Sequence, residues 1–185
     1  SNWSALGSGS AGNGSLSGRV NVIAISGTNM YVGGGFTNVN NGGTSLPEAD
    51  YVAKWNGSAW SALGSGIAGN GSLNGSVLAI LVSGTDVYVG GAFTNVSNET
   101  SLPAADYVAK WDGTNWSALG SNGAGGGSLS SNVYALAPDS EDLYVGGPFF
   151  NVSNVGAAIA CTPKRCSSST TKRPRSLNTP PSCSR

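Results

Sequence analysis

Few side chains in this chain are of the types that perform catalysis. The sequence contains no histidine. Serine–histidine–aspartate and cysteine–histidine sites, histidine-ligated metals and the most frequent general base are therefore excluded. Asp50 and Asp106 precede matching segments of the sequence and could form a carboxylate pair. Because copies of one repeat lie apart in space, we expect these two residues to cap loops instead.

Asp139, Glu141 and Asp142 lie within one short segment, and carboxylate oxygens are ligands that calcium prefers. The matching segments of the other repeats read Ser-Gly-Thr-Asn and Ser-Gly-Thr-Asp, which favours a polar hairpin turn. The glycine runs 33–35 and 125–127 lack the lysine and the helix of a phosphate-binding loop. We therefore expect no enzyme activity, no cofactor and no metal site.

All three cysteines, Cys161, Cys166 and Cys183, lie in a basic segment rich in Ser, Thr and Pro, residues 161–185. Residues 1–160 contain all nine acidic residues. The segment predicts a solvated, extended or disordered tail, with docking onto the acidic repeats as the alternative. A single Cys-x4-Cys spacing is a weak zinc motif, and one cysteine could form an intermolecular disulfide in a secreted protein.

Asn-x-Ser/Thr sequons are dense, and each could accept an N-linked glycan in a secreted eukaryotic protein. Asn-Gly-Ser is also good turn chemistry, so both interpretations stay open. Asn38 has lost the sequon that the equivalent Asn95 and Asn151 keep, which argues against strict selection for a glycan there. The candidate asparagines are Asn2, Asn13, Asn56, Asn70, Asn74, Asn95, Asn98, Asn115 and Asn151.

The tryptophans fall at repeated positions in the sequence. Their rings could stack on sugars in a lectin, but at repeated strand positions we expect them to pack between structural units. If a carbohydrate site exists, the loops 36–50 and 93–106 are better candidates, because loops carry function on rigid scaffolds. The five tryptophans are Trp3, Trp55, Trp60, Trp111 and Trp116.

A tandem repeat with a period of roughly 56 residues positions these side chains. Trp-Ser-Ala-Leu-Gly begins at Trp3, Trp60 and Trp116, and Tyr-Val-Ala-Lys-Trp begins at Tyr51 and Tyr107. Tyr-Val-Gly-Gly also recurs along the chain. A fixed period of this size indicates one supersecondary unit that is copied in an array.

The second repeat predicts four short antiparallel strands. Residues 77–82 are an apolar run typical of an inner strand, and residues 87–91 end in a glycine pair that permits close backbone approach. A polar loop separates them from residues 107–111 and 116–119, which an Asp-Gly turn joins. Four antiparallel strands per repeat predict an all-β fold made of β-propeller blades.

The repeats resemble Kelch-type blades of the galactose-oxidase propeller class. The resemblance rests on the glycine pair that ends the second strand, the aromatic residue of the third and the tryptophan of the fourth. The resemblance covers residues 1–154. The repeat sequence is also similar to repeats of large secreted or cell-surface proteins. The resemblance implies no copper chemistry, because the copper site of galactose oxidase requires histidines. Kelch-like propellers include enzymes, lectins and adhesion modules, so the fold alone does not imply one function.

The strand count predicts three Kelch-like blades within residues 1–160. They comprise residues 20–63, 77–119 and 133–160, with residues 3–6 completing the last. Its third strand would be the apolar segment 156–161, which lacks the aromatic residues of the other copies. The family commonly has six or seven blades, so three would leave apolar faces and strand edges open.

We therefore expect a structural or adhesive module, extracellular or at the cell surface, that self-assembles. Trp3, Ser4, Ala5 and Leu6 would complete the last blade of a neighbouring copy, in a six-bladed ring of two copies or in a filament. Two alternatives stay open, a carbohydrate-binding lectin-type propeller and a fragment of a larger Kelch-like surface protein. The expected partners are other copies of the repeat and glycans. The acidic repeats argue against nucleic-acid binding, and no apolar run is long enough to span a membrane.

Overall fold

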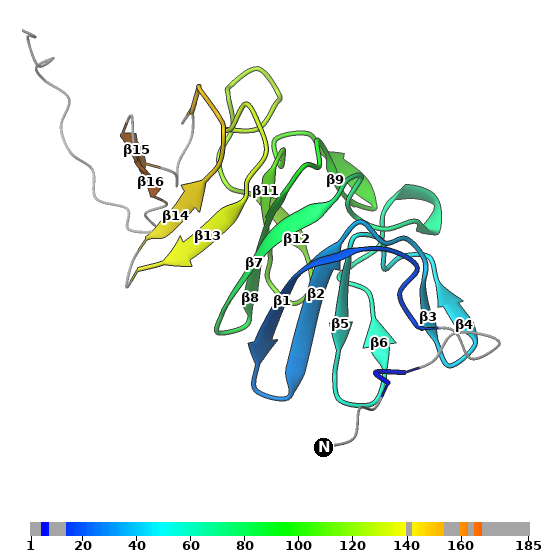
Figure 1. The fold of residues 1–185 in the computed structure, drawn as a ribbon. Coiled ribbons are helices and arrows are strands. Elements are labelled where there is room, and N and C mark those ends of the chain that lie inside the picture. The colour runs from blue at the N-terminus through cyan, green and yellow to red at the C-terminus, as the bar shows by residue number, and fades with distance from the viewer. Residues whose placement is uncertain (1–4, 8–13, 140–141, 154–159, 163–164, 168–185) are drawn as a thin grey trace, which may run out of the picture.

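The computed structural model describes residues 5–7, 14–139, 142–153, 160–162 and 165–167. Within these ranges the chain is all-β, with antiparallel strands and no α-helix, as the sequence predicts. Three sheets follow one another in an arc, and none of them closes (Figure 1). No helix in this part of the chain has the length and apolarity needed to cross a membrane.

The first sheet has four strands in the order β1-β2-β5-β6. A two-residue turn joins its first two strands, and Gly27 adopts the left-handed φ of 58° that such turns require. Trp55 and Trp60 are direct cross-strand partners. The strands are β1 (Val20–Ser26), β2 (Asn29–Gly34), β5 (Val52–Trp55) and β6 (Trp60–Ser61).

The second sheet repeats this arrangement in the order β12-β11-β8-β7. Its first two strands carry an irregularity between Val77 and Ala79, as β1 and β2 do between Val20 and Val22. Each of its strands lies within one residue of the predicted bounds. The strands are β7 (Val77–Ser83), β8 (Asp86–Gly91), β11 (Val108–Trp111) and β12 (Trp116–Ala118).

Two short hairpins lie within the loops 36–50 and 93–106, where the sequence predicted irregular structure. Val39 pairs with Leu46 in one hairpin, and Val96 pairs with Leu102 in the other. Strands of three residues are too short for an alternating pattern to be recognised in the sequence. The strands are β3 (Val39–Asn41), β4 (Thr44–Leu46), β9 (Val96–Asn98) and β10 (Thr100–Leu102).

The third sheet consists of two described strands, β13 (Ala135–Pro138) and β14 (Leu143–Gly146). The backbone N–H of Asp139 donates to the carbonyl oxygen of Asp142 at 2.8 Å, beside the pair formed by Pro138 and Leu143. Both strands lie within residues 133–160, where the sequence predicted the third blade.

The prediction that residues 156–161 add a third strand to this sheet is not met by the residues that are described. Residues 156–159 lie outside the described ranges. Residues 160 and 161 belong to β15 (Ala160–Thr162), which pairs with β16 (Arg165–Ser167) in a separate sheet. β16 lies beside β14, but no ladder joins them among the described strands (Figure 1). The segment lacks the aromatic residues of the equivalent strands in the other copies.

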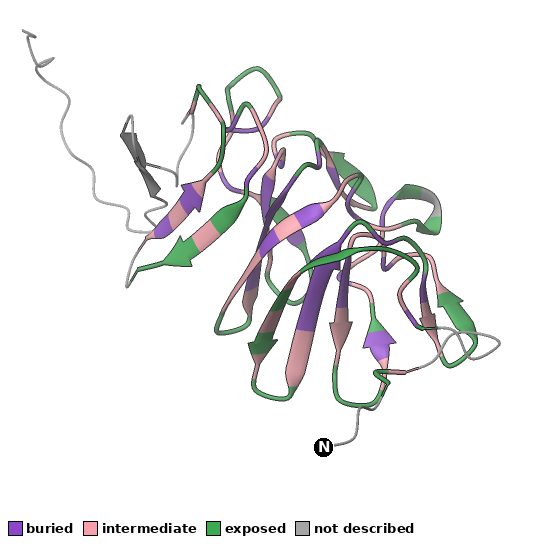
Figure 2. Cartoon of the chain, in the orientation of Figure 1, coloured by how far each residue is buried: buried purple, intermediate pink, exposed green. Residues whose placement is uncertain are grey.

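The core lies largely between neighbouring sheets. Tyr31 and Val52 of the first sheet pack with Val77, Val87 and Val89 of the second. A second cluster joins the second sheet to the third. Burial is accordingly high on the strands between sheets, while β1 is mostly exposed or half-buried (Figure 2). Each sheet thus depends on its neighbour to cover one of its faces.

Candidate functional site

The tryptophan that begins each fourth strand is anchored to the preceding copy of the repeat. The indole N–H of Trp116 donates to the carbonyl oxygen of Leu63 at 2.7 Å, and that of Trp60 donates to the carbonyl oxygen of Leu6 at 2.9 Å. A serine hydroxyl donates to the same carbonyl in both cases, from Ser15 to Leu6 and from Ser72 to Leu63. Ser128 donates to the carbonyl oxygen of Leu119, the equivalent leucine of the next copy.

The described tryptophans form one pair within each of the first two sheets, and Trp116 also belongs to the core between these sheets, where the sequence predicted the tryptophans to pack. The ring centroids of Trp55 and Trp60 are 5.3 Å apart, and those of Trp111 and Trp116 are 5.4 Å apart. Trp60 and Trp116 are only 4% and 3% exposed. These two rings therefore offer no open face on which a sugar could stack. Trp3 lies outside the described residues.

The N-terminal segment contacts the first sheet in the same way that the end of the fourth strand of the first sheet contacts the second sheet. Leu6 accepts the indole hydrogen bond of the first sheet, as Leu63 accepts that of the second. The two leucines differ in burial, because Leu6 is 46% exposed and Leu63 is 2% exposed. Of the predicted strand-exchange residues, Ala5 and Leu6 are therefore placed at the first sheet, while Trp3 and Ser4 lie outside the described residues.

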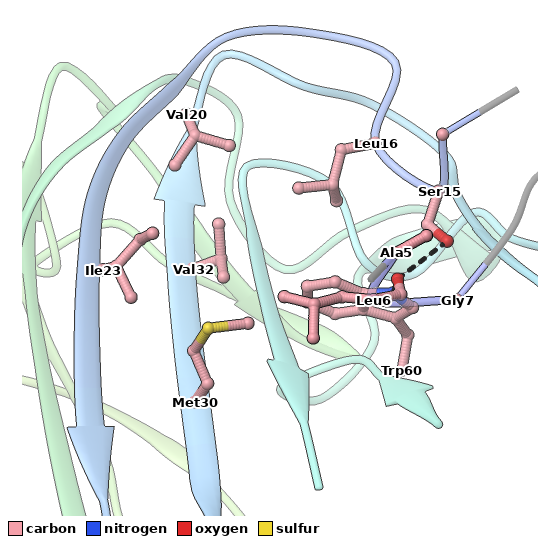
Figure 3. Close-up of a pocket in the computed structure, with 11 residues that line it drawn as sticks. Ala5, Leu6, Gly7, Ser15, Leu16, Val20, Ile23, Met30, Val32 and Trp60 are labelled. Carbon is pink, nitrogen blue, oxygen red and sulfur yellow. Dashed lines mark hydrogen bonds between the residues drawn. The ribbon is translucent and has the colours of Figure 1, made fainter. Parts of the chain in front are cut away.

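An apolar cleft of about 450 Å³ opens beside this segment on the outer face of the first sheet (Figure 3). Val20 is 39% exposed, whereas its repeat equivalent Val77 is fully buried. Ile23 is 56% exposed, whereas its equivalent Ile80 is half-buried and packs against the core between the sheets. The apolar side chains that line the cleft include Leu6, Leu16, Val20, Ile23, Met30 and Trp60.

The two repeated aspartates cap loops, as predicted. The backbone N–H of Asn38 donates to Asp50 Oδ1 at 2.7 Å, and that of Gly127 donates to Asp106 Oδ2 at 3.1 Å. Asp106 Oδ1 is buried and accepts no hydrogen bond from the described part of the chain. The two carboxylates thus accept hydrogen bonds from separate loops.

The remaining acidic and glycine motifs lie in turns or at the ends of strands. A backbone hydrogen bond joins Asp139 and Asp142 at the end of the β13–β14 pair, and Glu141 lies outside the described residues. The glycine run 125–127 takes part in a turn, in which Asn122 Oδ1 accepts the backbone N–H of Gly126 at 3.0 Å. The run 33–35 ends β2 at the contact with the second sheet. Across the described ranges, no three Cys, Asp or Glu residues gather where they could hold one metal ion.

The cysteines of the basic segment are placed in part. Cys161 and Cys166 are backbone register partners in the β15–β16 pair. Cys183 lies outside the described residues. Residues 165–167, which the sequence assigned to an extended or disordered tail, are therefore in a strand.

The sequon asparagines divide by what their side chains do. Asn56 Oδ1 accepts the backbone N–H groups of two following residues, which is the turn chemistry that the sequence suggested. The amide Nδ2 of Asn74 donates to Thr94 and that of Asn98 donates to Asn115. Asn2 and Asn13 lie outside the described residues, and Asn95 and Asn98 are half-buried. The exposed candidates are Asn56, Asn70, Asn74, Asn115 and Asn151.

One ion pair distinguishes the second sheet. Lys110 Nζ lies 3.0 Å from Asp86 Oδ2, and both side chains are 29% exposed. The hydrogen bond to Asp86 raises the pKa of Lys110 above its ordinary value, against a smaller effect of burial. In the first repeat Asn29 stands at the position of Asp86, and Lys54 stands at the position of Lys110. This ion pair is therefore specific to the second repeat and is not a shared feature of the repeats.

Sequence reasoning identified Leu6 but missed the apolar cleft beside it. The signal was available in part, because Val20, Ile23 and Met30 align with Val77, Ile80 and other apolar residues of the second repeat. The sequence does not show that the residues of the second repeat are covered by a neighbouring sheet while Val20 and Ile23 are exposed. Comparisons of the chain with protein-family models, with curated proteins and with solved structures found no match.

Proposed function

We propose that this chain is a non-catalytic structural or adhesive module, extracellular or at the cell surface, that self-assembles by sharing strands between copies. Its sheets would be blades of a Kelch-like propeller. The observation that carries the proposal is the bond from the Trp60 indole to the Leu6 carbonyl oxygen, which matches the bond between successive sheets from Trp116 to Leu63. The N-terminal segment thus stands where the last strand of a preceding blade would end.

Strand sharing also requires a sheet that can accept a strand, and the third sheet is the candidate acceptor. It has two paired strands in the described part of the chain, whereas the first and second sheets have four. Among the described strands no ladder joins β14 on the side away from β13, and a sheet edge is a place where a further strand can pair. Residues 3–6 of a second copy would add such a strand. Because donor and acceptor are different surfaces, repetition gives a ring where the rotation closes and a filament where it does not.

The lectin-type alternative has less support. Two of the four described tryptophan rings, Trp60 and Trp116, are covered by the fold, and Trp55 and Trp111 are half-buried and packed on them. The loops that were the other candidates contain Phe36 and Phe93, both fully buried, so their aromatic residues serve the core. Assembly accounts for the repeated contacts without a separate ligand site.

Deletion of residues 1–7 tests the proposal. Sedimentation velocity would compare the deletion variant with the full chain and with a length-matched control that lacks residues 179–185. We expect the full chain and the control to assemble, and the N-terminal deletion to remain monomeric. Thermal unfolding of each variant checks that the sheets still form, and electron microscopy distinguishes rings from filaments.

Two results would contradict strand sharing. One is a full chain that stays monomeric at all accessible concentrations. The other is a folded N-terminal deletion that assembles as the full chain does. A free peptide of residues 1–7 gives an independent check, because in excess it should compete with the donated strand and reduce assembly.

A further inference from the structure

The outer face of the first sheet is the equivalent of a face that is covered elsewhere in the molecule. We call this the valine face of a sheet, because it carries Val20 in the first sheet, Val77 in the second and Val133 in the third. Val77 and Val133 are fully buried, whereas Val20 is 39% exposed and borders the apolar cleft. The first sheet therefore presents an apolar surface of a kind that the fold buries in both other copies.

The preceding sheet covers this face in a specific way. A glycine near the end of its second strand lies directly on the valine of the next sheet. A Cβ atom added to Gly33 would lie 2.5 Å from Val77 Cγ1, and one added to Gly90 would lie 2.4 Å from Val133 Cγ1. Carbon atoms normally pack at about 3.5–4 Å, so only glycine permits the approach. The glycine-bearing surface is the covering face of each sheet.

The third sheet carries the same glycine without the partner. Gly146 aligns with Gly33 and Gly90 in the repeated Tyr-Val-Gly-Gly sequence. Among the described residues, the nearest atom to a Cβ added there is Ala135 Cβ of the same sheet, at 3.5 Å. Gly33 and Gly90 are buried, while Gly146 is half-buried. No valine of a following sheet occupies the place beside it in the described part of the chain.

The two ends of the array thus carry the two halves of one repeated contact. Such a pair is heterologous, since one surface of a molecule fits a different surface of the next. An open face of this kind is buried most readily by the surface that already buries its equivalents. A second copy of the chain offers that surface, with the same glycine and the same strand order.

We propose that the valine face of the first sheet is the docking surface for the third sheet of a second copy, with Gly146 of that copy packed on Val20. The inference rests on the proposed function, because it names the face-to-face contact that accompanies strand sharing. Leu6 would lie at the joint between the two molecules, as Leu63 lies at the joint between the first and second sheets. Docking would cover Leu6, Val20 and Ile23 together.

Disulfide cross-linking between two chains tests the contact. One chain carries Val20→Cys and the other carries Gly146→Cys, both in a background in which the three native cysteines are replaced by serine. The Gly90 Cβ position lies 2.9 Å from Val133 Cβ, so the matching pair is close enough for a disulfide after a small adjustment. We expect mixed oxidation to give a linked dimer that contains one chain of each kind.

Two controls make the test specific. Gly90→Cys with Val133→Cys in one chain reports the same geometry within a molecule and should form a disulfide readily. Ser26→Cys mixed with Gly146→Cys places the first thiol at the far end of β1, at a half-buried residue, and it should not link. Equal linking through Ser26 and Val20 would indicate random collision and overturn the proposal.

Combination with the N-terminal deletion separates the two proposals. Linking of Val20→Cys to Gly146→Cys that persists without residues 1–7 would support the docking surface and contradict strand sharing. Loss of assembly on deletion, together with no linking in the assembled full chain, would support strand sharing and overturn the docking surface. A monomeric chain in which the Val20→Cys thiol reacts freely with a maleimide reagent would overturn both.

Discussion

Substitution of Gly90 by alanine probes the contact between the second and third sheets. Gly90 is buried in β8, and an added Cβ would lie 2.4 Å from Val133 Cγ1 and 2.9 Å from Val133 Cβ. Val133 is itself fully buried. The valine has no rotamer change that removes the second contact, because Cβ is fixed by the backbone. The two sheets must therefore move apart.

Overpacking of a well-packed core by such an atom costs about 1–3 kcal/mol in the free energy of unfolding. Replacement of glycine by alanine also lowers the entropy of the unfolded chain, which stabilises by about 0.4–1 kcal/mol. The net loss for Gly90→Ala is then on the order of 1–2 kcal/mol. For a chain of this size, that corresponds to a melting temperature lower by roughly 2–8 °C.

Gly146→Ala is the matched control. It makes the same chemical change at the equivalent position, where the nearest described atom lies 3.5 Å from the new Cβ. We expect it to leave the stability of the monomer unchanged or slightly higher. Urea unfolding followed by tryptophan fluorescence would measure both variants at concentrations where the chain is monomeric. Equal losses in the two variants would refute the argument, because the clash with Val133 would then not determine the cost.

Three further outcomes are expected. Trp116→Phe should lose about 0.5–1.5 kcal/mol from its buried indole hydrogen bond, plus a contribution from lost packing, in urea unfolding; an unchanged midpoint would contradict this. Asp86→Asn should lower stability by at most about 1 kcal/mol at neutral pH. Because the pair raises the pKa of Lys110 in the folded state, its contribution is present below the unfolded value of 10.5 and is lost as pH rises through the folded value. A difference from the wild type that persists well above that pH would count against the pair. In a glycosylating host, peptide mass mapping should find higher occupancy at Asn56 than at Asn98, whose Nδ2 already donates; the reverse order would contradict that reading.

The strands of the repeat could be predicted from the sequence because local chemistry defines them. The apolar run of β7, the glycine pair of β8 and the Asp-Gly turn after β11 act over a few residues each. Repetition then checks one copy against another. Leu6 and the tryptophan packing were accessible for the same reason, since their positions recur.

Other features had no local signal. Tyr51 and Tyr107 adopt φ angles of 64° and 63°, a region that favours glycine. In both copies the backbone N–H of the tyrosine donates to a phenylalanine carbonyl across the loop, at 2.9 Å. Contacts distant in sequence hold this conformation, so no propensity of tyrosine could have predicted it.

The sequence by itself determined the unit of this protein, a four-stranded β repeat with tryptophan and glycine at fixed places. Only the tertiary structure decided which faces of the units are covered. Val20 and Val77 have the same side chain and the same place in the repeat, yet one is exposed and the other is fully buried. Burial depends on the neighbour that the chain places against a residue, and no sheet in the described part of the chain lies on the outer face of the first sheet. That difference leaves an apolar face exposed on the first sheet and covered on the second.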